Sequence, residues 1–229
     1  MKLNEVVPWG RTLEEYKLMF DLSQADLNKK ILGCGDGPAS FNAEMTKKGY
    51  SVVSIDPVYQ FSAQQIKQRV QDTYEPVISQ VKQNADRYIW KNFHNADELG
   101  QARLAAMERF LLDYETGKDE GRYLFQSLPS LELANNQFEL CVCSHLLFLY
   151  SDRLSLEFHI ASIHELLRIC PEVRIFPLLK LGVVLFLGLI LHVFCTDVFD
   201  LCLVIAFEHP HQRILCLFVL GIIIIIILR

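Results

Sequence analysis

The chain has 229 residues, a formal net charge of −5 and seven cysteines. This length allows one domain with a sizeable core, and the acidic balance lacks the basic face that nucleic-acid-binding proteins use, so we expect no nucleic-acid partner. The amino terminus is polar and has no secretory signal. The cysteines therefore indicate a cytoplasmic or other reducing compartment rather than a disulfide scaffold.

The first predicted helix covers residues 12–21. Thr12 and Glu15 have the spacing of a capping box, in which the hydroxyl and the carboxylate each accept a backbone hydrogen bond at the helix start. The apolar residues that share one face of this helix form its predicted core stripe: Leu13, Tyr16, Met19 and Phe20.

Residues 30–57 predict a strand, a glycine loop, a helix and a second strand that ends in an acid. Gly33, Gly35 and Gly37 let the backbone bend tightly and approach a ligand, and they leave free N–H groups near a helix start. Asp56 follows the second strand about twenty residues after the loop, where an acid can accept hydrogen bonds from two ribose hydroxyls.

Two residues in this loop narrow the interpretation. Pro38 stands where a dinucleotide-binding G-x-G-x-x-G loop has its third glycine, so NAD is the poorer fit. Cys34 lies inside the loop, where we predict a steric role for its small side chain. The alternative is a modifiable thiol.

Residues 58–121 form a helical insertion, because a loop of this length should contain structure of its own. One predicted helix covers residues 62–74 and ends near Pro76, and a second covers residues 95–114, followed by a charged turn. In a doubly wound fold the insertion lies near the mouth of the ligand crevice, where it could supply an acceptor pocket. Its aromatic residues and one histidine could line that pocket, although ordinary packing is favoured: Tyr59, Phe61, Tyr88, Trp90, Phe93 and His94.

The third and fourth predicted strands cover residues 122–127 and 138–144, and the fourth is a compact apolar run suited to a buried parallel sheet. Cys141 and Cys143 alternate onto one face of it, which predicts core packing, and they lack the second cysteine pair of a zinc site. We therefore expect no metal. A helix and a fifth strand follow: 155–169 and 173–179.

Three stretches of the chain resemble motifs of one enzyme family. Residues 31–37, Asp56 and residues 127–147 are similar, in this order, to the glycine loop, the ribose-binding acid and a downstream strand motif of class I S-adenosylmethionine-dependent methyltransferases. The resemblance covers residues 31–179 and implies a Rossmann-like fold, a three-layer, doubly wound and mostly parallel sheet. It also implies an enzyme that transfers a methyl group from S-adenosyl-L-methionine to an unidentified acceptor, either a small molecule or a protein.

The resemblance assigns cofactor-binding roles to Gly33, Cys34, Gly35, Gly37, Asp56, Leu128 and Ser144. Leu128 would flank the adenine, and Ser144 and His145 would face the methyl group. His145 is the candidate catalytic base, since its ordinary pKa lies near physiological pH, and the alternative is that it only caps the strand. A helix before the first strand commonly covers the cofactor in this family, which gives the lid candidates Trp9, Arg11 and Tyr16.

Two positions depart from the family pattern. The family usually has an acid where this chain has Ile31, and often another where it has Leu124. The alternative function is therefore a non-catalytic, cofactor-binding relative of these enzymes.

The composition changes at residue 182, so the predicted methyltransferase-like domain covers residues 1–181 and a hydrophobic tail covers residues 182–229. The tail lacks the alternating pattern of the helix and antiparallel hairpin that the family would add. Residues 182–207 are long enough for a membrane span of about 20 residues, but Asp197 and Asp200 would each cost roughly 2.5–3.5 kcal/mol at its centre. We favour an aberrant carboxyl terminus, from a frame or splicing change. The alternative is a membrane anchor on a vestigial domain.

Overall fold

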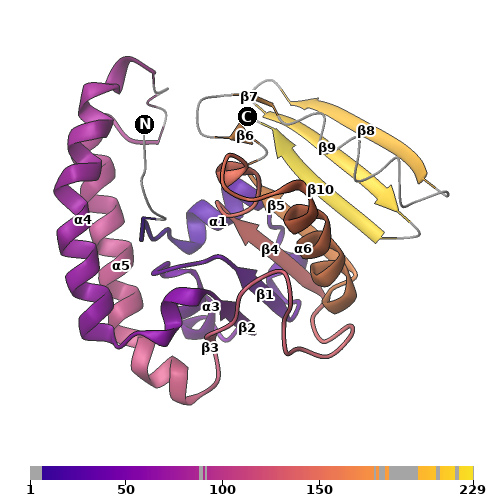
Figure 1. Ribbon diagram of the computed structural model, residues 1–229, viewed down its shortest axis with the longest axis horizontal. Helices are drawn as coiled ribbons and strands as arrows, with labels where there is room; N and C mark the ends of the chain where they lie inside the picture. Colours follow the sequence, from indigo (N-terminus) through magenta and orange to yellow (C-terminus); the bar gives the residue numbers. More distant parts are fainter. Residues whose placement is uncertain are drawn as a thin grey trace.

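The computed structural model describes residues 7–87, 90, 92–177, 179–180, 184–185, 201–209, 212–219 and 222–228 (Figure 1). Within them, six α-helices and an eight-stranded sheet that begins with five parallel strands build an α/β fold. The expectation of a mostly parallel sheet with helices is confirmed.

The parallel strands have the order β3-β2-β1-β4-β5. Their bounds are β1 Ile31–Cys34, β2 Val52–Ile55, β3 Tyr123–Leu124, β4 Leu140–Ser144 and β5 Glu172–Phe176. The third strand is therefore much shorter than expected. The chain order reverses between β1 and β4, which pair directly, and ligands of open α/β sheets bind outside the carboxyl ends of the strands at such a point.

The sheet carries a separate apolar layer on each face. One layer joins β1 and β4 to helix α6, Leu156–Ile169, and contains Cys141 and Cys143. The other contains Val142 and packs against α1, Leu13–Phe20, and α3, Phe41–Lys47. Side chains alternate across a strand, so this division confirms that both cysteines face one core.

Local signals set the helix ends as expected. Thr12 and Glu15 form the predicted capping box at the start of α1, and all four predicted stripe residues of α1 are buried. The short helix α2, Gln24–Leu27, follows with a second capping box. Helix α6 has Ser155 as its N-cap.

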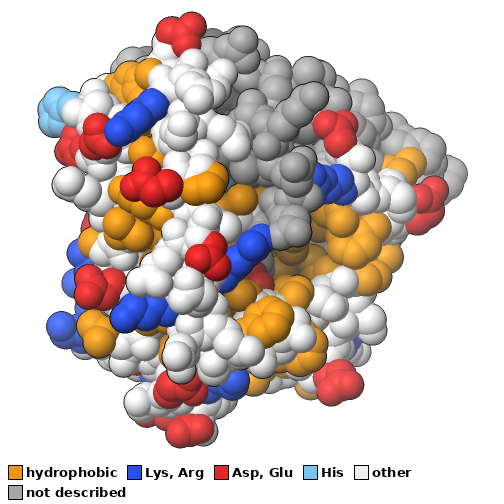
Figure 2. Space-filling model, turned by 60° about the vertical axis from the view of Figure 1, so that its left-hand side comes forward, with side chains coloured by type: hydrophobic (Ala, Val, Ile, Leu, Met, Phe, Trp, Pro, Cys, Tyr) orange, Lys and Arg blue, Asp and Glu red, His pale blue; other side chains and the backbone are white. Residues whose placement is uncertain are grey.

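The insertion is a hairpin of two long helices, α4 at Ala63–Gln83 and α5 at Ala96–Asp119. The prediction that the first helix ends near Pro76 was wrong, because α4 continues through this proline. Proline removes one helical hydrogen bond, but Val77, Ile78 and Val81 beyond it are buried, and this packing outweighs the loss. Figure 2 turns this side of the molecule forward and shows acidic and basic side chains interspersed on it.

Three short 3₁₀ turns connect these elements: η1 Pro57–Gln60, η2 Ala85–Arg87 and η3 Phe148–Tyr150. Helix α5 also differs from the prediction, since it includes most of the expected charged turn and ends just before Gly121, which has a positive φ of 74°.

The tail adds strands that its sequence did not predict. Strand β10, Ile222–Leu228, pairs in parallel with β5. Strands β9, Gln212–Val219, and β8, Leu201–His209, continue the sheet in antiparallel order. A small hairpin joins β6, Leu179–Lys180, to β7, Val184–Leu185. The expectation that the tail has no strand pair was therefore wrong.

Most of the predicted membrane span lies at residues 186–200, outside the described residues. Among the helices that the structure describes, none is both long and apolar enough to cross a bilayer. The aberrant terminus and the membrane anchor both stay predictions.

Candidate functional site

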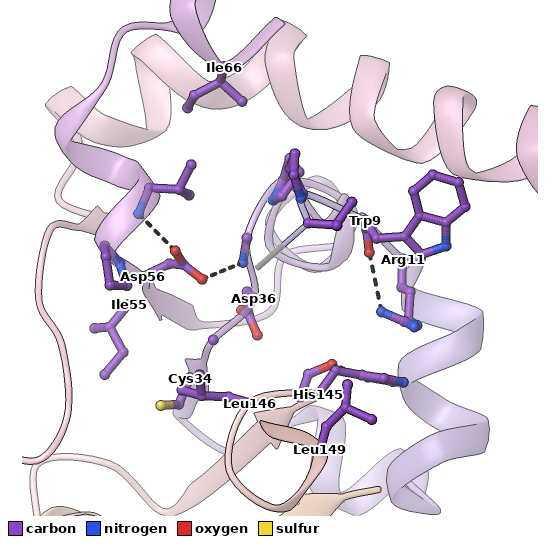
Figure 3. A pocket seen from close by; sticks show the side chains of 18 of the residues that line it. Trp9, Arg11, Cys34, Asp36, Ile55, Asp56, Ile66, His145, Leu146 and Leu149 are labelled. Carbon is purple, nitrogen blue, oxygen red and sulfur yellow. Dashed lines mark hydrogen bonds between the residues drawn. The ribbon is translucent and has the colours of Figure 1, made fainter. Parts of the chain in front are cut away.

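A cavity of about 900 Å³ lies at the carboxyl ends of β1, β2 and β4 (Figure 3). It brings together most of the site residues predicted from the sequence: Cys34, Gly35, Gly37, Asp56, Leu128, Ser144 and His145. Gly33 is the exception and does not line it.

Gly33 makes room for a neighbouring side chain. A Cβ at this position would lie 1.9 Å from Oδ2 of Asp36. We expected the missing side chain to admit a ligand, and the structure corrects this. Gly35 and Gly37 do face the cavity and have positive φ angles of 70° and 53°, a conformation that favours glycine.

Asp36 is the main site residue that sequence reasoning missed. Its Oδ1 accepts a hydrogen bond from the Tyr16 hydroxyl at 2.8 Å, and its Oδ2 accepts one from the Ser54 hydroxyl at 2.6 Å. Burial, with a smaller contribution from the charge of Asp56, raises the pKa of Asp36 to about 7. The position of Asp36 inside the glycine loop is the sequence signal that could have identified it as a site residue.

The raised pKa of Asp36 predicts a pH-dependent stability. Between about pH 4 and pH 7 the folded state holds a proton on Asp36 that the unfolded state, with a pKa of about 3.9, has lost. The contribution of Asp36 to stability is therefore fully present below pH 4 and is lost as the pH rises to about 7.

Thermal unfolding of the wild type and of Asp36→Asn across this range measures that contribution. The lowered pKa of His145 gives an opposite slope, so the difference between the two proteins is the quantity to compare. We expect the advantage of the wild type over the variant to shrink as the pH rises. A constant difference would contradict the raised pKa.

Asp56 connects the glycine loop to the end of β2. Its Oδ2 accepts a hydrogen bond from the Gly37 N–H at 2.9 Å, and its Oδ1 accepts one from the Val58 N–H at 2.8 Å (Figure 3). Burial raises its pKa, and these two hydrogen bonds oppose that shift. Each carboxylate oxygen has a second lone pair, so Asp56 can still accept hydrogen bonds from ligand hydroxyls.

His145 and Ser144 end β4 at the cavity. The Nδ1 atom of His145 lies 3.0 Å from the Ser144 hydroxyl oxygen, and its ring packs edge-on against Phe176. Burial, together with the charges of Arg11 and Arg103, holds the pKa of His145 well below its usual 6.5. The imidazole is therefore neutral at physiological pH, and the same lowered pKa makes it a weaker base than a free imidazole. Its catalytic role stays a prediction.

Cys34 lies beside Cys143, and both are buried. The neighbouring Cys143 thiol and burial raise the pKa of Cys34 well above its usual value. The thiol therefore stays protonated, which favours the steric role. Among the described residues, no cluster of histidine, cysteine or acidic side chains could hold a metal ion.

The three lid candidates, Trp9, Arg11 and Tyr16, all line the cavity. The indole of Trp9 stacks on Tyr74 of α4 with ring centroids 6.5 Å apart, so the amino-terminal segment contacts the inserted hairpin. The hairpin itself supplies a wall of the cavity through Ile66, Val77, Val81, Leu99 and Arg103. The expected position of the insertion is confirmed.

The aromatic residues of the insertion have mixed positions. Phe61 lines the cavity, whereas Tyr59 is buried in an aromatic cluster on α5. Trp90 packs under the far end of the hairpin, and the exposed His94 contacts Glu98. Phe93 does not line the cavity itself, but its ring lies under the guanidinium of Arg103, 5.6 Å from the ring centroid, and Tyr88 lies outside the described residues. Ordinary packing, the favoured alternative, therefore applies to most of the set.

No known family model matches the chain. A curated protein of Methanocaldococcus jannaschii, uncharacterized protein MJ0045, is 34% identical over 184 residues. The match covers 79% of this chain and 81% of that protein. The similarity therefore extends over most of both chains.

Proposed function

The chain belongs to the family of uncharacterized protein MJ0045 of Methanocaldococcus jannaschii, and we propose that it is an S-adenosylmethionine-dependent methyltransferase. One observation carries the proposal: a glycine loop after β1 and the carboxylate of Asp56 after β2 meet in one cavity at the point where the strand order reverses. Nucleoside ligands of doubly wound sheets bind at this position.

The residues of the cavity fit the proposed cofactor. Gly35 and Gly37 leave the loop open, Asp56 has free lone pairs for two ribose hydroxyls, and Leu128 supplies an apolar surface for the adenine. Asp56, and Asp36 once it has lost the proton that it holds up to about pH 7, give this side of the cavity negative charge, which suits the positive charges of a sulfonium and an ammonium.

When bound, S-adenosylmethionine supplies a methyl group that its sulfonium has already activated. The chain's contribution is then to align an acceptor with that methyl group in a pocket with little water, which lowers the entropic cost of the reaction. Neutral His145 at the end of β4 would accept a proton from a hydroxyl or amine acceptor.

Calorimetric titration of the full chain with S-adenosylmethionine tests the proposal. We expect saturable binding of S-adenosylmethionine. S-adenosylhomocysteine should compete with this binding, and NAD should not. A folded protein, as judged by circular dichroism, that does not bind S-adenosylmethionine would contradict the proposed function.

A second candidate function is S-adenosylmethionine binding without turnover. Ile31 is fully buried under α1, and Leu124 packs against the core around α6. The two positions at which the family has acids therefore contribute no polar group to the cavity. Binding without formation of S-adenosylhomocysteine, with acceptors of every chemical class offered, would favour this candidate.

A further inference from the structure

Among the described residues, two acids and three arginines line the cavity: Asp36, Asp56, Arg11, Arg69 and Arg103. Asp36 and Asp56 lie at the glycine loop, whereas Arg11 and Arg103 line another part of the wall. Figure 3 shows Asp56 and Arg11 on opposite sides of the cavity, with Asp36 between them. The acidic side suits the sulfonium and ammonium groups of the cofactor proposed above, whereas the arginine side suits an anion, either the carboxylate of that cofactor or a group on a second ligand.

Arg103 is held rigidly but has an unused donor. It lies on α5 with only 5% of its surface exposed, and its Nη1 donates a hydrogen bond to Oε2 of Glu15 at 2.6 Å. Its Nε–H has no hydrogen-bond partner among the described residues. Buried polar groups normally have partners, and Arg103 lines the cavity, so this N–H still requires a partner that the described residues do not supply.

Arg11 adds a second positive charge to this side of the cavity, and no second acidic side chain forms an ion pair with it among the described residues. Its Nη1 donates a hydrogen bond to the carbonyl oxygen of Trp9 at 3.2 Å, and none of the ion pairs among the described residues includes it. Burial and the charge of Arg103 lower its pKa to about 10, so it remains protonated at neutral pH. Two guanidinium groups and the one carboxylate of Glu15 leave a single positive charge, which one anionic group of a ligand would balance.

The arginine side also adjoins an apolar wall. Leu99 and Arg103 are four residues apart on α5, and residues at this spacing share a helix face. Val77 and Val81 of α4 line the same cavity. A ligand anion at the arginines would therefore have apolar surface beside it.

We propose that Arg11 and Arg103 bind the carboxylate of the methyl acceptor, whose apolar body lies against Leu99, Val77 and Val81. The acceptor class is then a small, mostly apolar carboxylic acid that also carries a hydroxyl or amine; this group receives the methyl from the sulfonium, its proton passes to His145, and S-adenosylhomocysteine is left. This inference rests on the proposed methyltransferase function. The cavity volume of about 900 Å³ is near the upper end of the range for ligand pockets, about 300–1,000 Å³, which allows room for a cofactor and a small acceptor.

The test uses the full chain saturated with S-adenosylhomocysteine and matched pairs of probes. Hexanoate and phenylacetate carry a carboxylate, whereas hexanamide and phenylacetamide have the same shape without the charge. We expect the acids to bind at least about tenfold more tightly than the amides. Arg11→Gln should remove this difference, as should Arg103→Lys, which keeps the charge near Glu15 but lacks the Nε–H donor. Arg109→Gln, an exposed arginine on the same helix, is the control and should bind like the wild type.

Three results would overturn the inference. One is equal binding of acids and amides, and another is binding of none of the probes. The third is that Arg11→Gln weakens binding of S-adenosylmethionine but not of its decarboxylated analogue, since the arginines would then hold the carboxylate of the cofactor. Failure of the proposed function is distinct from all three, because the wild type would then not bind S-adenosylmethionine at all.

Discussion

Replacing Asp56 with alanine is expected to weaken S-adenosylmethionine binding by at least about a hundredfold. Two hydrogen bonds from ribose hydroxyls to a carboxylate contribute about 1.5–3 kcal/mol each, and every 1.4 kcal/mol is tenfold in affinity. The substitution also removes the acceptors for the N–H groups of Gly37 and Val58, so the glycine loop loses its connection to β2. Calorimetric titration measures the change directly.

Two further variants make this result specific to the site. Asp56→Asn keeps the shape and one acceptor oxygen, so its loss of affinity should be smaller than that of Asp56→Ala. Asp119→Ala removes an exposed acid at the end of α5 and should bind like the wild type. Unchanged affinity in Asp56→Ala would remove the ribose-binding role from this residue.

Replacing Gly33 with alanine is expected to destabilise the fold by about 3 kcal/mol, the upper end of the usual cost of overpacking. The new Cβ would lie 1.9 Å from Oδ2 of Asp36. This carboxylate cannot move freely, because the hydroxyls of Tyr16 and Ser54 hold it from two sides. For a chain of this size we expect the midpoint of thermal unfolding to fall by about 10 °C.

A double-mutant cycle identifies the carboxylate as the cause. In an Asp36→Ala background the side chain that collides with the new Cβ is absent, so Gly33→Ala should cost much less there than in the wild type. The two substitutions should therefore be strongly non-additive. An equal cost in both backgrounds would show that backbone conformation, and not contact with Asp36, requires the glycine.

The parts of the fold that sequence predicted best depend on neighbours along the chain. The capping box of Thr12 and Glu15 and the alternation of Cys141 and Cys143 are local patterns, and both have the expected structural result. Pro76 shows the limit of such rules. The buried valines after it pack in the hairpin with α5, and this tertiary contact outweighs the helix-breaking tendency of proline.

The site residues could be predicted from the sequence where they belong to one motif. They could not be predicted where their contacts join distant parts of the chain. Cys34, Gly35, Gly37 and Asp56 lie in a single strand–loop–strand unit, and all of them line the cavity. Arg103 pairs with Glu15, 88 residues earlier in the chain, so no spacing rule indicated it. Asp36 is in the motif itself, but its hydroxyl partners come from α1 and β2.

The two ends of the cavity come from different parts of the chain. Loops at the ends of β1, β2 and β4 supply the end with the glycine loop, whereas the hairpin of α4 and α5, inserted between β2 and β3, supplies Val77, Val81, Leu99 and Arg103. Substitutions on the inner face of the hairpin can therefore change the size and polarity of its wall while the sheet and its loops keep their sequence. Under the proposed methyl transfer, such a division would let related proteins diverge in the acceptor they modify while they retain a common donor.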